Sequence, residues 1–539
     1  MLKEEDYERL EVFVTDVRAN IFALRGLPEV VKGALFSRYS RSTMGLRELL
    51  LKEFLPEESA KLPSQALEGI LDEEKASQFY DRVLDGYGDD SIGELGGAHL
   101  AVENVSMLGA KIMEDRRIGG SPLEKSTRYV FFDQKVSGDF SFYKDPVLLA
   151  SEHRDRYLSM CRRLFEAYKE LFPPLMEKAM EQYPRGESVS KGPYMASIRA
   201  HVLDIIRGLL PTSTLTNVGV FGNGRFFEYF CQKLLSHPLT EAKDIGEQAF
   251  GALSKVIPSF VRRAKREHKH CQSSIDFQEH LQSLLSSYAS VCRERSDFGV
   301  SEERPSVGVR LVDADNKAIP RMLAALLFPY TDLGMQELLD FSHSLSREEV
   351  AGIFESINSL RKNRRHKAPR GCETSFFTLE IICDFGAYRD LQRHRMLTQE
   401  RQLITCQHGF DLPWELQNTP FEETYRMVME EAALAHEEIA SDLPYEAQYV
   451  APMGYKMRWL MHVNLRALQW LCELRSGGAG HPSYRYIAQE IIRCVCKRFP
   501  ELEPFFCFAD MTDPRAEKEL GRLEQESRSE KKKQSMSSR

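Results

Sequence analysis

Residues 375–401 of this 539-residue chain read SFFTLEIICDFGAYRDLQRHRMLTQER. In the first part of this stretch an apolar side chain stands at every second position, at Phe377, Leu379, Ile381, Cys383 and Phe385. A period of two places these side chains on one face of a β-strand. The next residues predict a short helix that ends at Arg393-His394-Arg395. The stretch therefore predicts a strand and a helix that lead to two guanidinium groups and an imidazole.

A weaker copy of the same pattern occurs earlier in the chain. The strand-like segment 98–102 leads into a helical pattern that ends at Asp115-Arg116-Arg117, and Glu124-Lys125-Ser126-Thr127-Arg128-Tyr129 follows. Further landmarks recur in the same order, with Glu48 as Glu337, Glu94 as Glu373, Pro211 as Pro452 and Asn223 as Asn464. The pattern from His462 to Arg475 predicts one helix. The separation falls from 278 residues between Arg117 and Arg395 to 241 between Pro211 and Pro452, so the first copy carries an insertion, which we place within 134–190.

The repeat predicts how the chain is organised, since 539 residues exceed what one ordinary core holds. We expect a mixed α+β fold of two similar lobes, each a mostly antiparallel sheet packed with helices, which together form a pseudo-dimer. Lobe one is placed at 1–265 and lobe two at 305–510. A polar, helical connector is expected at 266–304, and the charged segment 511–539, poor in apolar residues, is expected to be a disordered tail.

Composition excludes several classes of protein. A net charge of −8 argues against a general nucleic-acid binder, and no apolar run approaches the length of a membrane span. The acidic start of the chain lacks a signal-peptide pattern. Eleven cysteines without a C-x-x-C pair indicate buried thiols in a reducing compartment rather than disulfides or a metal site. We therefore expect a cytoplasmic protein that binds no metal, membrane or nucleic acid.

The motif residues suit the recognition of anions. Two guanidinium groups beside the His394 imidazole offer fixed donors for a phosphate or for an electron-rich ring with carbonyls. The Ser126 hydroxyl, the neighbouring backbone amides and the Arg128 guanidinium make a second phosphate cradle. The alternative for the triplet is a solvated basic turn, but its repeated place after a strand and helix favours a site.

Read together, the two segments resemble the Arg-His-Arg signature and the following Glu-x-Ser-x-Arg-Tyr of the flavin-dependent thymidylate synthases. Neither copy is complete. Lobe one has Asp115 and Arg116 in place of Arg and His, and Leu234 in place of the Arg at 475. Lobe two has Gln448 in place of the Arg at 207, and Arg401-Gln402-Leu403 interrupts its tail. The losses are complementary, because each lobe retains the groups that the other lacks.

The resemblance implies reductive methylation of dUMP to dTMP, with FAD as cofactor and with NADPH and methylenetetrahydrofolate as co-substrates. It implies a catalytic role for Arg475, which favours the N3-deprotonated uracil. The implied dUMP-binding residues are Glu124, Ser126, Arg128, Arg207, Arg393 and Arg475. The implied FAD-binding residues are Ser91, Glu94, Arg393, His394, Arg395, Asn464 and Arg466. Since the family is homotetrameric with sites between subunits, the resemblance also implies a homodimer that forms a pseudo-tetramer, with one composite site built within one chain or between two.

Two departures keep other readings open. Asp89 stands where the family has His, and Asp390 stands where it usually has Gln. An acidic group near a phosphate is unfavourable unless Gln392 or a shifted helix compensates. The alternatives are a catalytically inactive flavin- or nucleotide-binding scaffold of the same fold, and a different flavin or nucleotide enzyme. Complementary rather than random losses favour retained catalysis.

Overall fold

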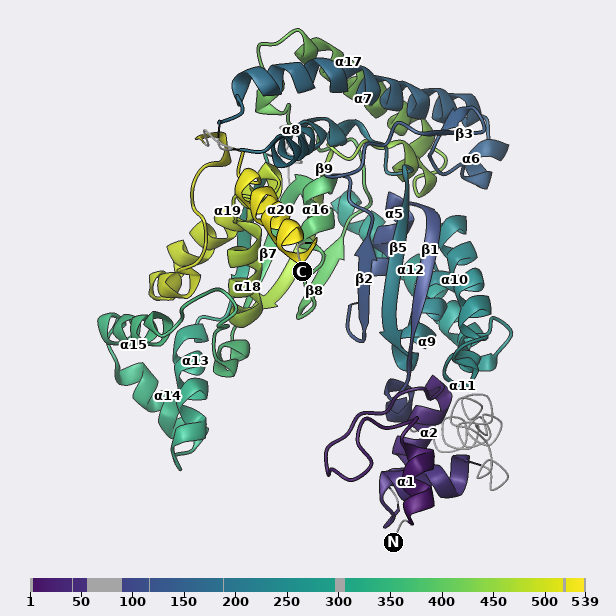
Figure 1. Ribbon diagram of the computed structural model, residues 1–539. Coiled ribbons are helices and arrows are strands. Elements are labelled where there is room, and N and C mark those ends of the chain that lie inside the picture. The colour runs from purple at the N-terminus through teal and green to yellow at the C-terminus, as the bar shows by residue number, and fades with distance from the viewer. Residues whose placement is uncertain are drawn as a thin grey trace. The chain divides into compact units, whose positions relative to one another are not determined.

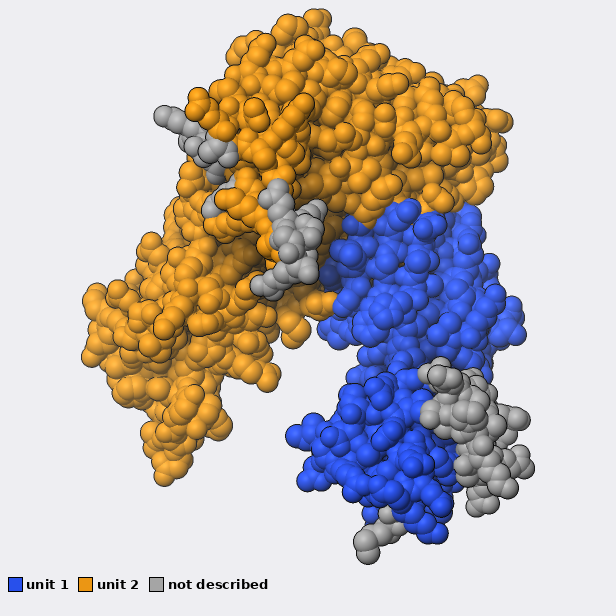
Figure 2. Space-filling view, viewed as in Figure 1, with its two compact units in different colours: residues 1–103, 116–124, 217–299 blue, residues 104–115, 125–216, 300–539 orange. Residues whose placement is uncertain are grey.

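The computed structural model describes residues 3–40, 42–55, 90–115, 117–187, 189–295, 306–516 and 520–537. The chain divides into two compact units (Figure 2). Unit 1 comprises residues 1–103, 116–124 and 217–299, and unit 2 comprises residues 104–115, 125–216 and 300–539. The division differs from the predicted lobes, because segments 104–115 and 125–216 of lobe one belong to the same unit as the whole of lobe two.

Unit 1 contains a three-stranded sheet in the order β1-β5-β2 (Figure 1). The strands are β1 (Gly97–Ser106), β2 (Gly120–Glu124) and β5 (Leu215–Asn223), and β2 pairs antiparallel with β5. The N-terminal helices are α1 (Glu4–Leu10), α2 (Glu29–Tyr39) and α3 (Leu46–Leu49), with the helical turns η1 (Leu50–Phe54) and η5 (Asp90–Glu94). After β5 come α9 (Gly224–Leu235), α10 (Thr240–Leu253), α11 (Pro258–Val261), η7 (Arg262–Ala264) and α12 (Lys269–Arg295). Helix α12 lies in the connector that the sequence predicts to be helical.

Unit 2 is built on a four-stranded antiparallel sheet in the order β6-β7-β9-β8. Its strands are β6 (Gly308–Ala314), β7 (Phe376–Asp384), β8 (Leu397–Arg401) and β9 (Lys456–Asn464). The alternation predicted for β7 is confirmed, because Phe377, Leu379, Ile381 and Cys383 are all fully buried. These side chains form the core with α19 (Pro482–Arg498), which packs against β6 and β7. Phe385 begins the next helix, α16 (Phe385–Leu391).

Helices from both lobes complete unit 2. The predicted insertion forms β3 (Lys135–Val136), β4 (Asp139–Phe140), α6 (Pro146–Ala150) and the long α7 (Arg154–Gln182), which packs against α8 (Lys191–Ile206) and α17 (Phe421–Ala440). The other elements are α5 (Met107–Glu114), η6 (Arg207–Leu209), α13 (Ala318–Leu327), η8 (Phe328–Tyr330), α14 (Met335–Ser344), α15 (Arg347–Ser359), η9 (Arg370–Thr374), η10 (Trp414–Leu416), η11 (Glu446–Val450), α18 (Leu465–Arg475), η12 (Pro500–Phe506), η13 (Pro514–Ala516) and α20 (Leu523–Ser537).

The tandem duplication is visible in equivalent contacts. The strand order β1-β5-β2 of the first copy matches β7-β9-β8 of the second. The Asn223 side chain caps α9 by accepting a bond from the backbone N–H of Phe226, and Asn464 caps α18 in the same way through Ala467. An ion pair joins Arg225 to Glu94 at 2.7 Å, and its counterpart joins Arg466 to Glu373 at 2.8 Å. The α+β fold of two repeated lobes is therefore confirmed.

Equivalent segments of the two copies also pair with each other inside unit 2. Pro211 and Pro452 form an antiparallel bridge. The N–H of Thr212 donates to Ala451 at 3.0 Å, and the equivalent N–H of Met453 donates to Leu210 at 2.8 Å. Each bond thus has a symmetry-related counterpart, as in the self-complementary contact of a two-fold dimer. A local pseudo-two-fold axis therefore passes between the two segments of one chain.

Two sequence predictions differ from the structure. The pattern from His462 to Arg475 predicts one helix, but β9 continues to Asn464 and α18 begins at Leu465. The reason is the pairing of β9 with β7 and β8, which extends the strand through Val463 and into the helix cap. The predicted disordered tail contains α20, which packs against α8, and Arg522 just before it is buried against Asp204. Among the described residues, no helix has both the length and the apolar character needed to cross a membrane.

Candidate functional site

Four arginines gather around one carboxylate in unit 2. We call Arg128, Arg207, Arg393, Arg475 and Asp390 the arginine cluster. Asp390 lies in the last turn of α16, and Arg393 follows that helix. Arg475 ends α18, Arg207 follows α8, and Arg128 lies in the segment after β2. The cluster thus combines the groups retained by lobe one with those retained by lobe two, and all of them belong to unit 2 of a single chain.

Asp390 is the centre of this cluster. Its Oδ2 lies 3.6 Å from Nη1 of Arg207, and its Oδ1 lies 3.7 Å from Nη1 of Arg475. Burial alone raises the pKa of this carboxyl, but the positive charges of Arg207, Arg475, Arg393 and Arg128 outweigh burial and hold the pKa well below its usual range. Asp390 is therefore ionised at neutral pH and neutralises part of the positive charge around it.

Arg128 is fixed by contacts with residues from both lobes. Its Nε and Nη2 donate to the two carboxylate oxygens of Asp204, each at 2.9 Å, and its Nη1 donates to the Tyr484 hydroxyl at 2.9 Å. The Ser126 hydroxyl accepts a bond from the backbone N–H of Arg128 at 3.3 Å, which shapes the turn that carries the guanidinium. Ser126 therefore positions Arg128 as well as offering its own hydroxyl.

Arg475 and His394 interact directly. Nε of Arg475 donates to Nε2 of His394 at 3.3 Å, which requires that this ring nitrogen be unprotonated. The Arg475 guanidinium lies 5.5 Å from the centre of the Tyr484 ring, and the Arg128 guanidinium lies at the same distance from it. Burial lowers the pKa of Arg475, although the charge of Asp390 opposes this shift. Tyr484 thus contacts two arginines of the cluster.

Three residues that sequence reasoning missed complete the surroundings of the cluster: Tyr484, Asp204 and Arg522. Nη2 of Arg522 donates to Asp204 at 2.6 Å, so Asp204 serves two guanidinium groups. Five guanidinium groups therefore face the carboxylates of Asp204 and Asp390, and they still outnumber the carboxylates when Asp384 beside Arg207 is included. The remaining positive charge suits an anionic ligand. No motif identifies these three residues, since they become neighbours only through the fold.

The residues of the other copy that correspond to this cluster bond to protein groups of their own. Asp115, the counterpart of Arg393, forms an ion pair with Arg401 and accepts a bond from Nε2 of Gln392 at 2.6 Å. Gln448, the counterpart of Arg207, accepts a bond from the backbone N–H of Ile404 at 3.1 Å. Gln392 thus faces Asp115, and among the described residues no hydrogen bond joins it to Asp390, so Gln392 does not compensate the charge of Asp390 as the sequence suggested.

The remaining predicted site residues divide between the units. Asn464 uses its side-chain oxygen to cap α18, and Arg466 bonds the Ala368 carbonyl and Glu373, while Arg395 is exposed. Ser91 and Glu94 lie on η5 of unit 1, where Glu94 accepts a bond from Arg225. Glu124 ends β2 of unit 1 and is buried. Arg116 and Asp89 lie outside the described residues. The structure thus brings together Arg128, Arg207, Arg393, His394 and Arg475.

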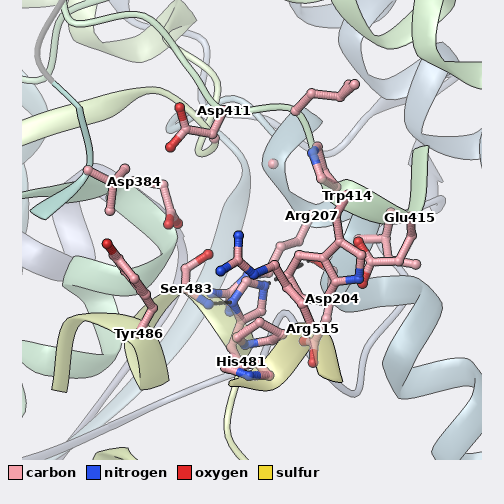
Figure 3. Close-up of a pocket in the computed structure, with 18 of the residues that line it drawn as sticks. Asp204, Arg207, Asp384, Asp411, Trp414, Glu415, His481, Ser483, Tyr486 and Arg515 are labelled. Atoms are coloured by element: carbon pink, nitrogen blue, oxygen red, sulfur yellow. Dashed lines mark hydrogen bonds between the residues drawn. The ribbon is translucent and has the colours of Figure 1, made fainter. Parts of the chain in front are cut away.

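A cavity of about 500 Å³ adjoins Arg207 in unit 2 (Figure 3). Its wall comes from the end of α8, the loop 411–417, the start of α19 and the segment 513–515. Arg207 and Asp204 line it, whereas Asp390, Arg475 and Arg128 do not. Arg207 therefore takes part in the arginine cluster and in the wall of a separate cavity.

Comparison with known proteins identifies relatives along the whole chain. The family described as "Thymidylate synthase complementing protein" matches residues 51–259 and again residues 310–501. A "UPF0159 protein" of Chlamydia muridarum is 50% identical over 528 residues, covering 97% of this chain and 98% of its own. One from Chlamydia pneumoniae is 49% identical over 98% of this chain and 99% of its own. One from Thermoplasma acidophilum is 32% identical over 92% of this chain and 98% of its own. The double match agrees with the duplication.

Proposed function

We propose that this chain, which belongs to the thymidylate synthase complementing protein family, converts dUMP to dTMP by flavin-dependent reductive methylation at one composite site. The observation that carries the proposal is the arginine cluster, in which the retained groups of both lobes meet inside unit 2. Random decay would have removed the same groups from both copies as often as different ones. The complementary set therefore supports a site maintained for an anionic ligand.

The proposed roles are those that the family resemblance implies, and the neighbourhood of the arginine cluster supports them. Arg207 and Arg128, with the Ser126 hydroxyl, hold the nucleotide phosphate, and Arg393 joins them from lobe two. Arg475 faces the pyrimidine and stabilises its N3-deprotonated form, because a nearby cation favours an adjacent anion. His394 accepts a bond from Nε of Arg475 and thereby orients this guanidinium. Glu124 stays a prediction for the same ligand.

The residues of lobe two fit a flavin dinucleotide. Among the described residues, Nδ2 of Asn464 and Nη2 of Arg466 have no hydrogen-bond partner, since Asn464 caps α18 with its oxygen and Arg466 uses Nε and Nη1. Both donors remain available for the cofactor, and the resemblance assigns Arg393, His394 and the exposed Arg395 to the same ligand. FAD would carry the hydride from NADPH, and methylenetetrahydrofolate would supply the carbon. Ser91 and Glu94 stay predictions for the same cofactor.

One observation favours a second candidate function. Asp390 already neutralises Arg207 and Arg475, which a phosphate would otherwise occupy. A protein that binds flavin or nucleotide without catalysis would tolerate this loss of affinity. The test is tritium release from dUMP labelled at carbon 5, with FAD, NADPH and methylenetetrahydrofolate.

The proposal expects turnover in the wild type and none with Arg475→Ala or Ser126→Ala. Arg426→Ala is the matched control, since Arg426 is exposed on α17 and, among the residues that the structure describes, pairs only with its neighbour Glu422. Flavin titration should give about one FAD per chain, and sedimentation should give a dimer of chains. Two FAD per chain would contradict the single composite site, and flavin binding without turnover would favour the scaffold.

A further inference from the structure

The C-terminal segment of the chain reaches the surroundings of the arginine cluster. The second region that the family matches ends at residue 501, so Arg522 and α20 lie beyond it. Helix α20 packs against α8 (Figure 1), and the Glu530 carboxylate accepts a bond from the Ser190 hydroxyl just before α8. Asp204 lies in the last turn of α8, and this packing places Arg522 beside it. A segment outside the family match thus contributes a cation next to the proposed site.

Arg522 is buried and bonds to the same acceptors as Arg128. Its Nη2 donates to Oδ2 of Asp204 at 2.6 Å, and its Nε donates to the Ala479 carbonyl at 3.2 Å. Arg128 donates to both carboxylate oxygens of Asp204, each at 2.9 Å, and to the same Ala479 carbonyl at 3.2 Å. The Arg522 guanidinium also lies 5.3 Å from the centre of the Tyr129 ring. Two guanidinium groups that are distant in sequence therefore share one carboxylate.

The charges of these three side chains decide what they offer to an anion. Burial raises the pKa of Asp204 and the charge of Arg128 opposes this shift, and bonds from two guanidinium groups keep the carboxylate ionised at neutral pH. Arg128 and Asp204 alone would form a two-bond ion pair with no net charge. Arg522 adds a second positive charge, and among the described residues Asp204 is the one carboxylate that pairs with it. The group therefore carries one net positive charge, which comes from the C-terminal segment.

This charge acts on the arginine cluster. Asp204 interacts electrostatically with Arg207 and Asp390, and Arg128 interacts with Asp390, so the group adjoins the place proposed for the nucleotide phosphate. A unit charge roughly 8 Å from a dianion changes its affinity by on the order of tenfold, once rearrangement of side chains and screening by salt are included. Arg522 needs no contact with the ligand for this effect, because the effect is electrostatic.

We propose that Arg522 is a further positioning residue of the anion site, contributed by a C-terminal segment that the family match does not include. It shares the Asp204 carboxylate with Arg128 and thereby prevents Asp204 from cancelling the charge of Arg128. The proposal rests on the proposed function in one respect, since dUMP is the anion that the site is expected to take. The alternative is a purely structural role, in which Arg522 only fastens α20 to α8.

The test is calorimetric titration of the full chain with dUMP, deoxyuridine and pyrophosphate, without flavin. Arg522→Ala lowers the net charge of the group to zero, so dUMP should bind about tenfold more weakly than to the wild type. Asp204→Asn raises the net charge by one, and this variant should bind dUMP at least as tightly as the wild type. The double variant has the net charge of the wild type and should regain its affinity to within about threefold. Deoxyuridine, which lacks the phosphate, should respond to none of these changes.

Two further variants and a measurement of stability separate the charge from the structural role. Arg522→Lys keeps the charge without the guanidinium fork and should lose less affinity than Arg522→Ala. Lys531→Ala removes an exposed cation from α20 and should leave dUMP affinity unchanged. Circular dichroism and thermal unfolding show whether each variant is folded. A structural role predicts that affinity follows stability, so the double variant, which also lacks the ion pair, would not regain affinity.

The outcomes distinguish this proposal from the proposed function. Binding of dUMP without tritium release would remove thymidylate synthesis and leave the role of Arg522 intact. If the wild type binds pyrophosphate but not dUMP, the same comparison of variants is made with pyrophosphate. Turnover by Arg522→Ala with a raised KM for dUMP and an unchanged kcat would support the proposal. Unchanged anion affinity in folded Arg522→Ala, a double variant as weak as Arg522→Ala, or no binding of either anion to the wild type at about 1 mM would each overturn it.

Discussion

Replacing Asp390 by asparagine separates the charge of this residue from its shape. In the free protein its carboxylate lies between Arg207 and Arg475, at 3.6 and 3.7 Å from their nearest nitrogens. A phosphate held by the same two guanidinium groups would lie roughly 6 Å from that carboxylate, because a guanidinium group stands between the two anions and the two contacts are not in line. The substitution removes the negative charge, keeps the size, and leaves both arginines in place.

The magnitude follows from Coulomb's law. A dianion about 6 Å from a single negative charge is repelled by roughly 5 kcal/mol at an effective dielectric constant of about 20. Rearrangement of the side chains and screening by salt reduce this repulsion. If about a third of the repulsion remains, it amounts to about 2 kcal/mol, which corresponds to about 30-fold in affinity. In the protein without nucleotide the substitution has the opposite effect and lowers the stability of the fold, since breaking a buried ion pair costs about 3–5 kcal/mol. The variant should therefore be less stable alone and bind the nucleotide more tightly.

The assay combines calorimetric titration of dUMP with thermal unfolding, in the wild type and in Asp390→Asn. The expected result is a lower unfolding midpoint without ligand, a larger rise of that midpoint with dUMP, and a dissociation constant about 30-fold smaller. Asp384→Asn is an informative comparison, because Asp384 also lies near Arg207 but caps α16 through Ala387. Weaker dUMP binding in folded Asp390→Asn would refute the reasoning, because it would mean that the carboxylate itself binds the nucleotide.

Three further predictions concern neighbouring contacts. Tyr484→Phe removes the acceptor of Arg128 Nη1, and chemical denaturation should show a loss of about 1 kcal/mol, with a higher KM for dUMP and little change in kcat. Asp115→Ala leaves Arg401 without its carboxylate partner, and the same measurement should show a loss of about 2 kcal/mol, with dUMP affinity unchanged. Glu415 has a folded pKa of about 7 against 4.5 when unfolded, so its contribution to stability is present below pH 4.5 and is lost as the pH rises through 7. Glu415→Gln should therefore unfold at a higher temperature relative to wild type at pH 8 than at pH 5, and an equal difference at both values would contradict the assigned pKa.

The sequence predicted the elements that depend on local pattern. The alternation of Phe377, Leu379, Ile381 and Cys383 identified β7 correctly, because burial on one face imposes a period of two. The same reasoning failed at His462–Asn464, where apolar spacing suits both a strand and a helix and the partner strands decide. The complementary motif residues were found because each copy resembles part of a family signature, and the repeat allowed the two copies to be compared position by position.

The surroundings of the site could not be predicted in this way. Tyr484 contacts Arg128 across 356 residues of sequence, and Arg522 contacts Asp204 across 318. Neither belongs to a repeated motif, so no spacing connects them to the arginines. Arg522 also lies in a segment whose composition indicates disorder, and its buried ion pair together with the packing of α20 against α8 explains why the chain is ordered there. Contacts between residues distant in sequence thus determine the surroundings of the site and the order of the C-terminal segment, which local composition does not predict.

The two related positions of the pseudo-dimer show what a duplication permits. In a dimer of identical chains one substitution alters both symmetry-related positions. In this chain the two positions are encoded separately, so a substitution alters only one of them. One position has become an internal ion pair, in which Asp115 binds Arg401 and Gln392. The other keeps Arg128, Arg207, Arg393 and Arg475, with positive charge in excess of its carboxylates. Retaining buried arginines is unfavourable for stability, and the contacts of Asp115 show that the same fold can fill the related position with an internal ion pair instead. Their persistence on one side is therefore best explained by a ligand that requires their charge.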